Sequence, residues 1–246
     1  ADFSDPNQWT AFGAGRVGLV GCVDADGNSL EGDERPDSCE GHPARNARNF
    51  NFDIRSCAHV VEVGDYLYFA STSTNAMLRY NTRLEFTDHT SWEYFDISEI
   101  TGGDGFLGIA TDGQYIYYRH TLTSVFVRFD TEGEVNENGS AFSNLDNWRR
   151  IDPRGFGNTS GNSAQIILIE DYLYIPPGER SNAMVRLNTN LDPDDSDSWD
   201  FFAAPQAGFS SAIFLESSRS LIYSPWVDGN GRHSNFLKYQ IDVPEE

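Results

Sequence analysis

The segment between residues 24 and 34 carries the densest run of oxygen ligands in the chain. It consists of Asp24-Ala-Asp26-Gly-Asn28-Ser-Leu-Glu31-Gly-Asp33-Glu34. Calcium binds several carboxylate and amide oxygens that converge from a flexible loop. Asp24, Asp26, Asn28 and Asp33 therefore predict a calcium site, and calcium is the only cofactor expected. The segment is not an EF-hand, because glycine falls at the fourth place and Arg35 stands where the bidentate glutamate would be. An acidic surface loop without metal is the alternative.

Four polar residues of different chemistry lie in short segments that each precede an apolar run: His59, Asp104, Gln165 and Ser211. Hydrolysis of a glycosidic bond needs two carboxylates across a cleft. Asp104 has no credible carboxylate partner in the sequence, and His59 is the only other candidate for acid–base work. We therefore interpret His59, Gln165 and Ser211 as ligand-binding residues, and Asp104 with His59 as the catalytic pair only if the protein is an enzyme. The alternative is that these segments are small and polar because neighbouring strands crowd there.

Trp226 is the one tryptophan after residue 9 that does not open a strand-like run, and it lies beside Gly229-Asn230-Gly231. An aromatic ring on a loop can stack on a sugar or anchor a protein partner. Trp226 is therefore predicted to bind ligand, and packing beneath its own loop is the alternative.

The cysteines and two asparagines bear on the compartment. Cys22 and Cys39 bracket an irregular polar stretch and are predicted to form a disulfide, whereas Cys57 lies in an apolar run and is expected to be a buried thiol. Asn138 and Asn158 occupy Asn-x-Ser/Thr triplets, which are glycosylation acceptors in a secretory protein. Disulfides persist in oxidising compartments, so the expected location is secreted or extracellular. The chain begins with Ala1, as a processed mature form would.

The formal net charge of −21 argues against nucleic acid and anionic membranes as partners, because both require a basic surface. The sequence contains no run of 18 apolar residues, so membrane insertion is not expected. It also lacks a Gly-x-Ser-x-Gly elbow, a phosphate loop and a dinucleotide fingerprint.

Residues 56–242 are organised as a repeat of about 50 residues, the period typical of propeller blades. Each copy begins with an aromatic strand core, continues with a basic residue before a large apolar one, and in three copies ends with a tryptophan. The strand cores are Tyr66-Leu67-Tyr68, Tyr115-Ile116-Tyr117, Tyr172-Leu173-Tyr174 and Leu221-Ile222-Tyr223; the second strands carry Arg79, Arg128, Arg186 and Lys238; the tryptophans are Trp92, Trp148 and Trp199.

The fourth copy ends without a tryptophan, and the missing element stands at the other end of the chain, in Trp9-Thr-Ala-Phe12. The step from Trp199 through the termini to Trp9 is similar to the steps between the other tryptophans. This predicts a closed ring in which residues 8–12 supply the last strand of the final blade. Closure would remove the exposed sheet edges.

We therefore expect an all-β fold, a single β-propeller of four-stranded antiparallel blades. Five blades are favoured, because Phe50-Asn-Phe-Asp-Ile54 resembles Trp92-Glu-Tyr-Phe-Asp-Ile97. The alternative is four blades with an insertion at about 14–54. The predicted blades are 14–54, which is irregular, 56–97, 105–152, 163–204, and 210–242 completed by 8–12.

The units resemble those of kelch-type and olfactomedin-type β-propellers. Kelch repeats carry a Tyr-Asp turn followed by a tryptophan, and Tyr80-Asn81 before Trp92 is similar; the kelch glycine doublet, however, is replaced here by pairs such as Tyr118-Arg119. Olfactomedin-type domains are five-bladed with Tyr-rich strands and an Arg-Phe-Asp-like turn, which Arg128-Phe129-Asp130 resembles. The resemblance implies a fold, and fold alone does not give function.

These patterns favour a secreted, non-catalytic propeller that acts as a binding or assembly module for a glycan or an extracellular protein. Two alternatives stay open. The first is a glycoside hydrolase or polysaccharide lyase with its site at the central channel. The second is an extracellular structural subunit whose partner is itself and which assembles into polymers.

Overall fold

The computed structural model describes residues 57–71, 76–86, 88–101, 105–120, 125–153, 166–176, 183–203, 209–215, 218–225 and 237–241. The predicted first blade and the predicted closing strand at residues 8–12 lie outside this part of the chain. The described part is almost entirely β-structure, with one short helix, α1 (Ser98–Thr101).

The strands form four antiparallel sheets, each made from strands that follow one another in the chain. Sheet I contains β1 (Cys57–Val63), β2 (Tyr66–Ser71), β3 (Ala76–Asn81) and β4 (Trp92–Asp96); sheet II contains β5 (Phe106–Thr111), β6 (Tyr115–His120), β7 (Phe126–Asp130) and β8 (Trp148–Ile151); sheet III contains β9 (Ile167–Ile169), β10 (Tyr172–Ile175), β11 (Ala183–Asn188) and β12 (Trp199–Ala203); sheet IV contains β13 (Phe209–Leu215), β14 (Ser220–Pro225) and β15 (Leu237–Gln240).

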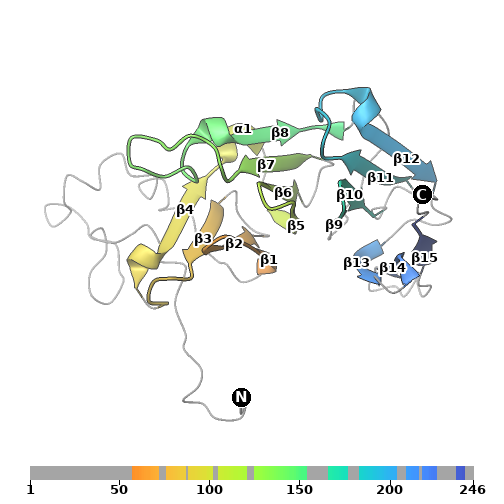
Figure 1. Ribbon diagram of the computed structural model, residues 1–246, viewed down its shortest axis with the longest axis horizontal. Coiled ribbons are helices and arrows are strands. Elements are labelled where there is room, and N and C mark those ends of the chain that lie inside the picture. Colours follow the sequence, from red (N-terminus) through yellow and green to blue (C-terminus); the bar gives the residue numbers. More distant parts are fainter. Residues whose placement is uncertain are drawn as a thin grey trace, which may run out of the picture.

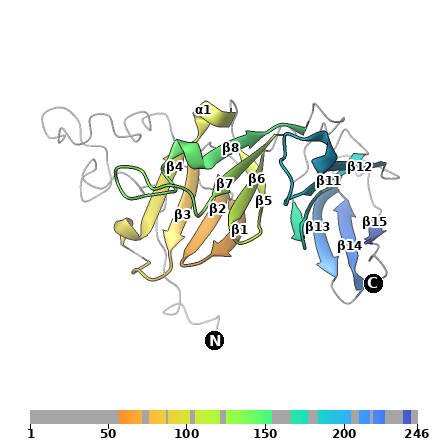
Figure 2. The same ribbon diagram turned by 45° about the horizontal axis from the view of Figure 1, so that its top comes forward.

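The sheets are arranged like the blades of a propeller. The first strand of each sheet contacts the first strand of the next: β1 lies against β5, β5 against β9, and β9 against β13. Figure 1 shows these four strands converging, with the outer strands β4, β8 and β12 at the periphery, and Figure 2 shows the same order of sheets from a second direction. The predicted fold class, an all-β propeller, is confirmed. The fifth blade and the ring closure stay predictions.

Apolar side chains from facing sheets form the core between each pair of blades. Tyr68 of sheet I packs with Phe106 and Phe129 of sheet II, Phe126 of sheet II packs in the cluster that includes Leu173 of sheet III, and the third cluster joins sheets III and IV. Burying one large apolar side chain stabilises a fold by about 1.5–3 kcal/mol. The sheets are therefore held together mainly by these inter-blade clusters.

The tryptophan that opens the fourth strand is fixed in the same way in three sheets. The indole Nε1–H of Trp92, Trp148 and Trp199 donates to the carbonyl oxygen six residues earlier, at 2.9, 2.8 and 2.9 Å. A 3-10 helix of three residues directly precedes each tryptophan: His89–Ser91, Leu145–Asn147 and Ser196–Ser198. Each indole thus ties the connection between the third and fourth strands to the sheet that it leads into.

A ladder of tyrosine, arginine and acid crosses the outer strands. The guanidinium carbon lies 4.2 Å from the ring centre for Arg79 over Tyr66, 4.1 Å for Arg128 over Tyr115 and 4.3 Å for Arg186 over Tyr172. Directly across the next strand, Arg79 faces Glu93 and Arg186 faces Asp200. Both pairs form ion pairs with a closest distance of 2.5 Å. The ladder explains why the sequence repeats a basic residue at this position.

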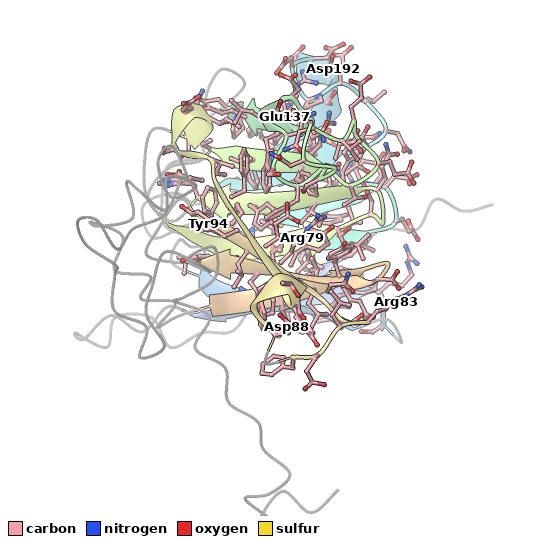
Figure 3. All side chains as sticks on the ribbon, turned by 90° about the vertical axis from the view of Figure 1, so that its left-hand side faces the viewer. Arg79, Arg83, Asp88, Tyr94, Glu137 and Asp192 are labelled. Atoms are coloured by element: carbon pink, nitrogen blue, oxygen red, sulfur yellow. The ribbon has the colours of Figure 1, made fainter. Side chains whose placement is uncertain are left out.

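Sheet II departs from the ladder, because Arg149 stands opposite Arg128 in place of an acid. Arg149 instead donates to Asp192, at 2.8 Å, and to Asp194, both in the connection between β11 and β12 of the next sheet. Sheet I has a matching contact: Ser140, in the connection between β7 and β8, donates to Glu93. The connections before β8 and β12 therefore reach back to the fourth strand of the preceding sheet. Figure 3 labels one residue from the connection before each of β4, β8 and β12. Asp88 lies lowest in the view, Glu137 lies above it, and Asp192 lies at the top.

The turns at this end of the sheets repeat as well. Thr82, Thr131 and Thr189 follow the third strands, and each donates its backbone N–H and its hydroxyl to one carbonyl of the turn between the first and second strands. The preceding Asn81, Asp130 and Asn188 accept from a backbone N–H two residues on. These bonds satisfy polar groups locally, as turn-forming Asn, Asp and Thr side chains commonly do.

Replacing Trp148 with Phe should lower the free energy of unfolding by about 1–3 kcal/mol, because the carbonyl of Phe142 would lose its buried donor. Urea denaturation of the two proteins measures the difference. Leu145→Ala, at an exposed position in the same connection, is the control and should change stability by less than about 0.5 kcal/mol. Equal stability of Trp148→Phe and the wild type would contradict the role given to the indole bond.

The two ladder ion pairs differ in burial and should differ in strength. The side chains of Arg79 and Glu93 are 9% and 30% exposed, whereas those of Arg186 and Asp200 are 26% and 49% exposed. Glu93→Gln should therefore cost about 1–3 kcal/mol, because it leaves a buried guanidinium without its counter-charge. Asp200→Asn should cost less than about 1 kcal/mol. Urea denaturation tests the order, and a larger loss for Asp200→Asn would contradict it.

Candidate functional site

The first strands of three sheets share an irregularity close to the residue where each strand begins. The pairing register with the second strand shifts between Cys57 and His59, between Phe106 and Gly108, and between Phe209 and Ser211. A shift of this kind is a β-bulge, which bends the strand and re-aims its side chains, and bulges are frequent beside functional sites. The bulges mark the end of the propeller where the inner strands begin, which we call the entry face.

His59 joins two sheets at the entry face. Its Nδ1 lies 2.6 Å from the carbonyl oxygen of Leu107, the extra residue in the bulge of β5. A carbonyl oxygen can only accept, so Nδ1 carries the proton. In the neutral imidazole the other nitrogen, Nε2, is then a hydrogen-bond acceptor. The half-buried ring is therefore held in one orientation with a defined tautomer.

Two further polar side chains lie at the end of β6, next to the start of β5. Arg119 and His120 are 1% and 2% exposed. The guanidinium carbon of Arg119 lies 5.1 Å from the ring centre of Phe126, and the ring of His120 lies edge-on to Phe106 at 5.5 Å. Burial lowers the pKa of Arg119 to about 10. Burying a cation costs free energy, so a buried arginine marks a candidate functional position.

Arg119 and His120 have no counterparts in the neighbouring sheet. Arg119 and His120 stand two and three residues after Tyr117. The residues two and three after the equivalent Tyr68 of sheet I are Ala70 and Ser71. The turn-forming Thr82, Thr131 and Thr189 at the opposite end recur in sheets I, II and III, whereas Arg119 and His120 break the repeat. The entry face is therefore the more specialised end of the described part of the molecule.

The structure places three of the predicted site residues. His59 lies in β1 at the entry face. Ser211 lies in β13, where its backbone pairs with Ser224 beside the bulge. Asn138 is exposed in the connection between β7 and β8, where its N–H donates to Asn136 at 2.9 Å. The other predicted site residues lie outside the described part of the chain: Asp24, Asp26, Asn28, Asp33, Cys22, Cys39, Asp104, Asn158, Gln165 and Trp226.

The sequence analysis singled out His59 as a site residue, but not Arg119, His120 or the carbonyl of Leu107. Tyr118-Arg119 stood out only as a departure from the kelch glycine doublet. The Leu107 contact had no such signal, because it depends on a bulge. Within the described ranges no group of His, Cys, Asp or Glu side chains is placed to hold a metal ion. Among the same residues, no helix has the length and apolar character needed to cross a membrane.

No protein family and no curated protein matches the sequence of the chain. Solved structures do match its fold, at low identity. They include a chain in the crystal structure of a mitotic checkpoint complex (11% identity, TM-score 0.46, 75% of this chain and 49% of that one) and the β-propeller domain of Cps50 (Swd1) from Myceliophteria thermophila (12%, 0.43, 75% and 54%). A glutaminyl cyclase from Myxococcus xanthus also matches (10%, 0.38, 74% and 72%). The chain spans about half the length of the first two.

The tautomer of His59 is a direct check on the site. In neutral His59 the proton should reside on Nδ1, because the carbonyl of Leu107 requires a donor. Nitrogen-15 NMR of the neutral imidazole distinguishes the two nitrogens, with His59→Gln used to assign the signal. A proton on Nε2 would contradict the bridge between β1 and β5.

Proposed function

We propose that this chain is a secreted, non-catalytic β-propeller that binds a glycan or an extracellular protein at its entry face. One contrast carries the proposal. At the end with the turns, the indole bonds of the tryptophans and the turn bonds of Thr82, Thr131 and Thr189 repeat in sheets I, II and III. At the entry face, His59, Arg119 and His120 are specific to sheets I and II and lie around bulged strand starts. Repetition is expected of a scaffold, and departure from it is expected of a binding site.

The chemistry of the entry face suits a ligand rich in hydroxyl or carboxylate oxygens. The neutral His59 offers an acceptor at Nε2 and the protonated ring a donor. Rings of Phe106 and Phe126 lie beside His120 and Arg119, respectively. Polar groups set among aromatic rings are typical of ligand sites. Gln165, Ser211 and Trp226 remain the other proposed ligand contacts.

The secreted location rests on the predicted pairing of Cys22 with Cys39 and on the two glycosylation triplets. Asn138 is exposed, as an acceptor asparagine must be. The calcium site at Asp24, Asp26, Asn28 and Asp33 remains a proposal.

A glycoside hydrolase or lyase is the second candidate, and His59 favours it. A histidine whose Nδ1–H is held by a carbonyl has a basic Nε2 in a fixed orientation, which is how general bases are commonly positioned. In that case His59 would take a proton from the substrate or from water, with Asp104 as the proposed acid.

Binding to an immobilised array of neutral and acidic glycans tests the primary proposal. The wild type should bind at least one class, and His59→Ala should weaken that binding about tenfold, the effect of losing one hydrogen bond. His89→Ala is the matched control, because His89 lies in the 3-10 helix at the opposite end, and it should bind like the wild type. Glycan binding that is unchanged in His59→Ala would contradict the proposed site.

The same proteins separate binding from catalysis. Each is incubated with a panel of polysaccharides, and new reducing ends or unsaturated products are measured. If the wild type releases such products and His59→Ala does not, the protein is an enzyme and the proposal of a non-catalytic binding module is wrong.

A further inference from the structure

The connection before each described fourth strand has a sequence pattern that can be recognised once its hydrogen bonds are known. Phe or Pro stands six residues before the tryptophan and its carbonyl accepts from the indole, as in Phe86, Phe142 and Pro193. Asp or Asn stands four residues before the tryptophan, and its side-chain oxygen accepts from a backbone N–H two residues on, as in Asp88, Asn144 and Asp195. The pattern defines a clasp that turns the chain into its last strand.

The first nine residues of the chain carry the same sequence pattern as the clasps. Phe3 stands six residues before Trp9, and Asp5 stands four residues before it. The aromatic residue, the capping Asp or Asn, and the tryptophan thus recur with the spacing seen in sheets I and II. This match is independent of the repeat period, because it concerns residues within one connection.

Sheet IV is the sheet that this clasp fits. It has three described strands where the other sheets have four. In the complete sheets the tryptophan pairs directly with the last large apolar residue of the third strand: Trp92 with Tyr80, Trp148 with Phe129, and Trp199 with Leu187. The aromatic pairs have ring centres 4.7 and 4.6 Å apart. Tyr239 holds this position in β15.

The preceding sheet supplies a second contact surface. In sheet II, Phe142 of the clasp lies 6.4 Å from Phe95, which is three residues after the tryptophan of sheet I. The corresponding residue of sheet III is Phe202, and its ring lies 6.2 Å from that of Tyr239. Phe202 and Tyr239 therefore form one aromatic surface that spans sheets III and IV.

We propose that residues 3–12 of the same chain dock on this surface, with Trp9 against Tyr239, Phe3 over Phe202, and residues 9–12 paired with β15. The clasp sequence identifies the occupant, because other segments of this chain with the same spacing already occupy the equivalent sites of sheets I to III. The proposal is independent of what the entry face binds.

A thermodynamic cycle tests the docking. Trp9→Ala should lower the melting temperature of the full chain by about 10 °C, as expected for removal of a buried tryptophan. Trp199→Ala, whose contacts are established, is the matched control and should have a similar effect. The double variant Trp9→Ala/Tyr239→Ala should lose less than the sum of the single losses, because contacting residues couple. A melting temperature unchanged by Trp9→Ala, or strictly additive losses, would overturn the proposal.

Hydrogen exchange on the wild-type chain needs no variant to fold. The peptide that contains β15 should be protected to the same degree as those that contain β3 and β7, and rapid exchange of β15 alone would overturn the proposal. Size-exclusion chromatography with light scattering identifies the donor of the segment. A monomer with protected β15 supports docking within one chain, and protection that disappears when dimers or polymers are diluted assigns the site to a second copy instead.

Discussion

The fold depends on fixing the outermost strand of each blade, because that strand has a neighbour on only one side. An edge strand is held by fewer contacts than an inner strand and is a template for unwanted pairing. The indole bonds of Trp92, Trp148 and Trp199 meet this requirement by tying the start of the strand to its own connection. The same connection then bonds to the preceding sheet, through Ser140 to Glu93 and through Asp192 to Arg149. The connection that precedes the fourth strand therefore stabilises both its own blade and the contact of that blade with the preceding one.

This arrangement gives the two ends of the described part different polar contacts. At the end with the tryptophan clasps, the indole and threonine bonds are short-range and repeat in sheets I, II and III. At the entry face the contacts join different sheets, as His59 does with Leu107, and polar residues such as Arg119 are buried. The proposed ligand site lies at this end, away from the bonds that repeat in sheets I, II and III.

The repeat predicted much of the fold, because period and residue type are directly visible in sequence. The predicted strand core Tyr172-Leu173-Tyr174 lies in β10 (Tyr172–Ile175), and Trp199 opens β12 as expected. The bulges at His59 and Gly108 and the pairing of Arg149 with Asp192 were not predicted, because they depend on backbone register and on contacts between distant residues. The burial of Arg119 was not predicted either, because it depends on the packed neighbour Phe126.

The location of the binding site at the entry face is the central claim. Hydrogen exchange of the full chain, measured with and without the glycan or protein that it binds most tightly, tests this claim most directly. The account predicts new protection in peptides that contain the starts of β1, β5 and β13 and the end of β6, with no change in the connections at residues 82–91, 131–147 and 189–198. Protection confined to those connections, with the strand starts unchanged, would contradict it.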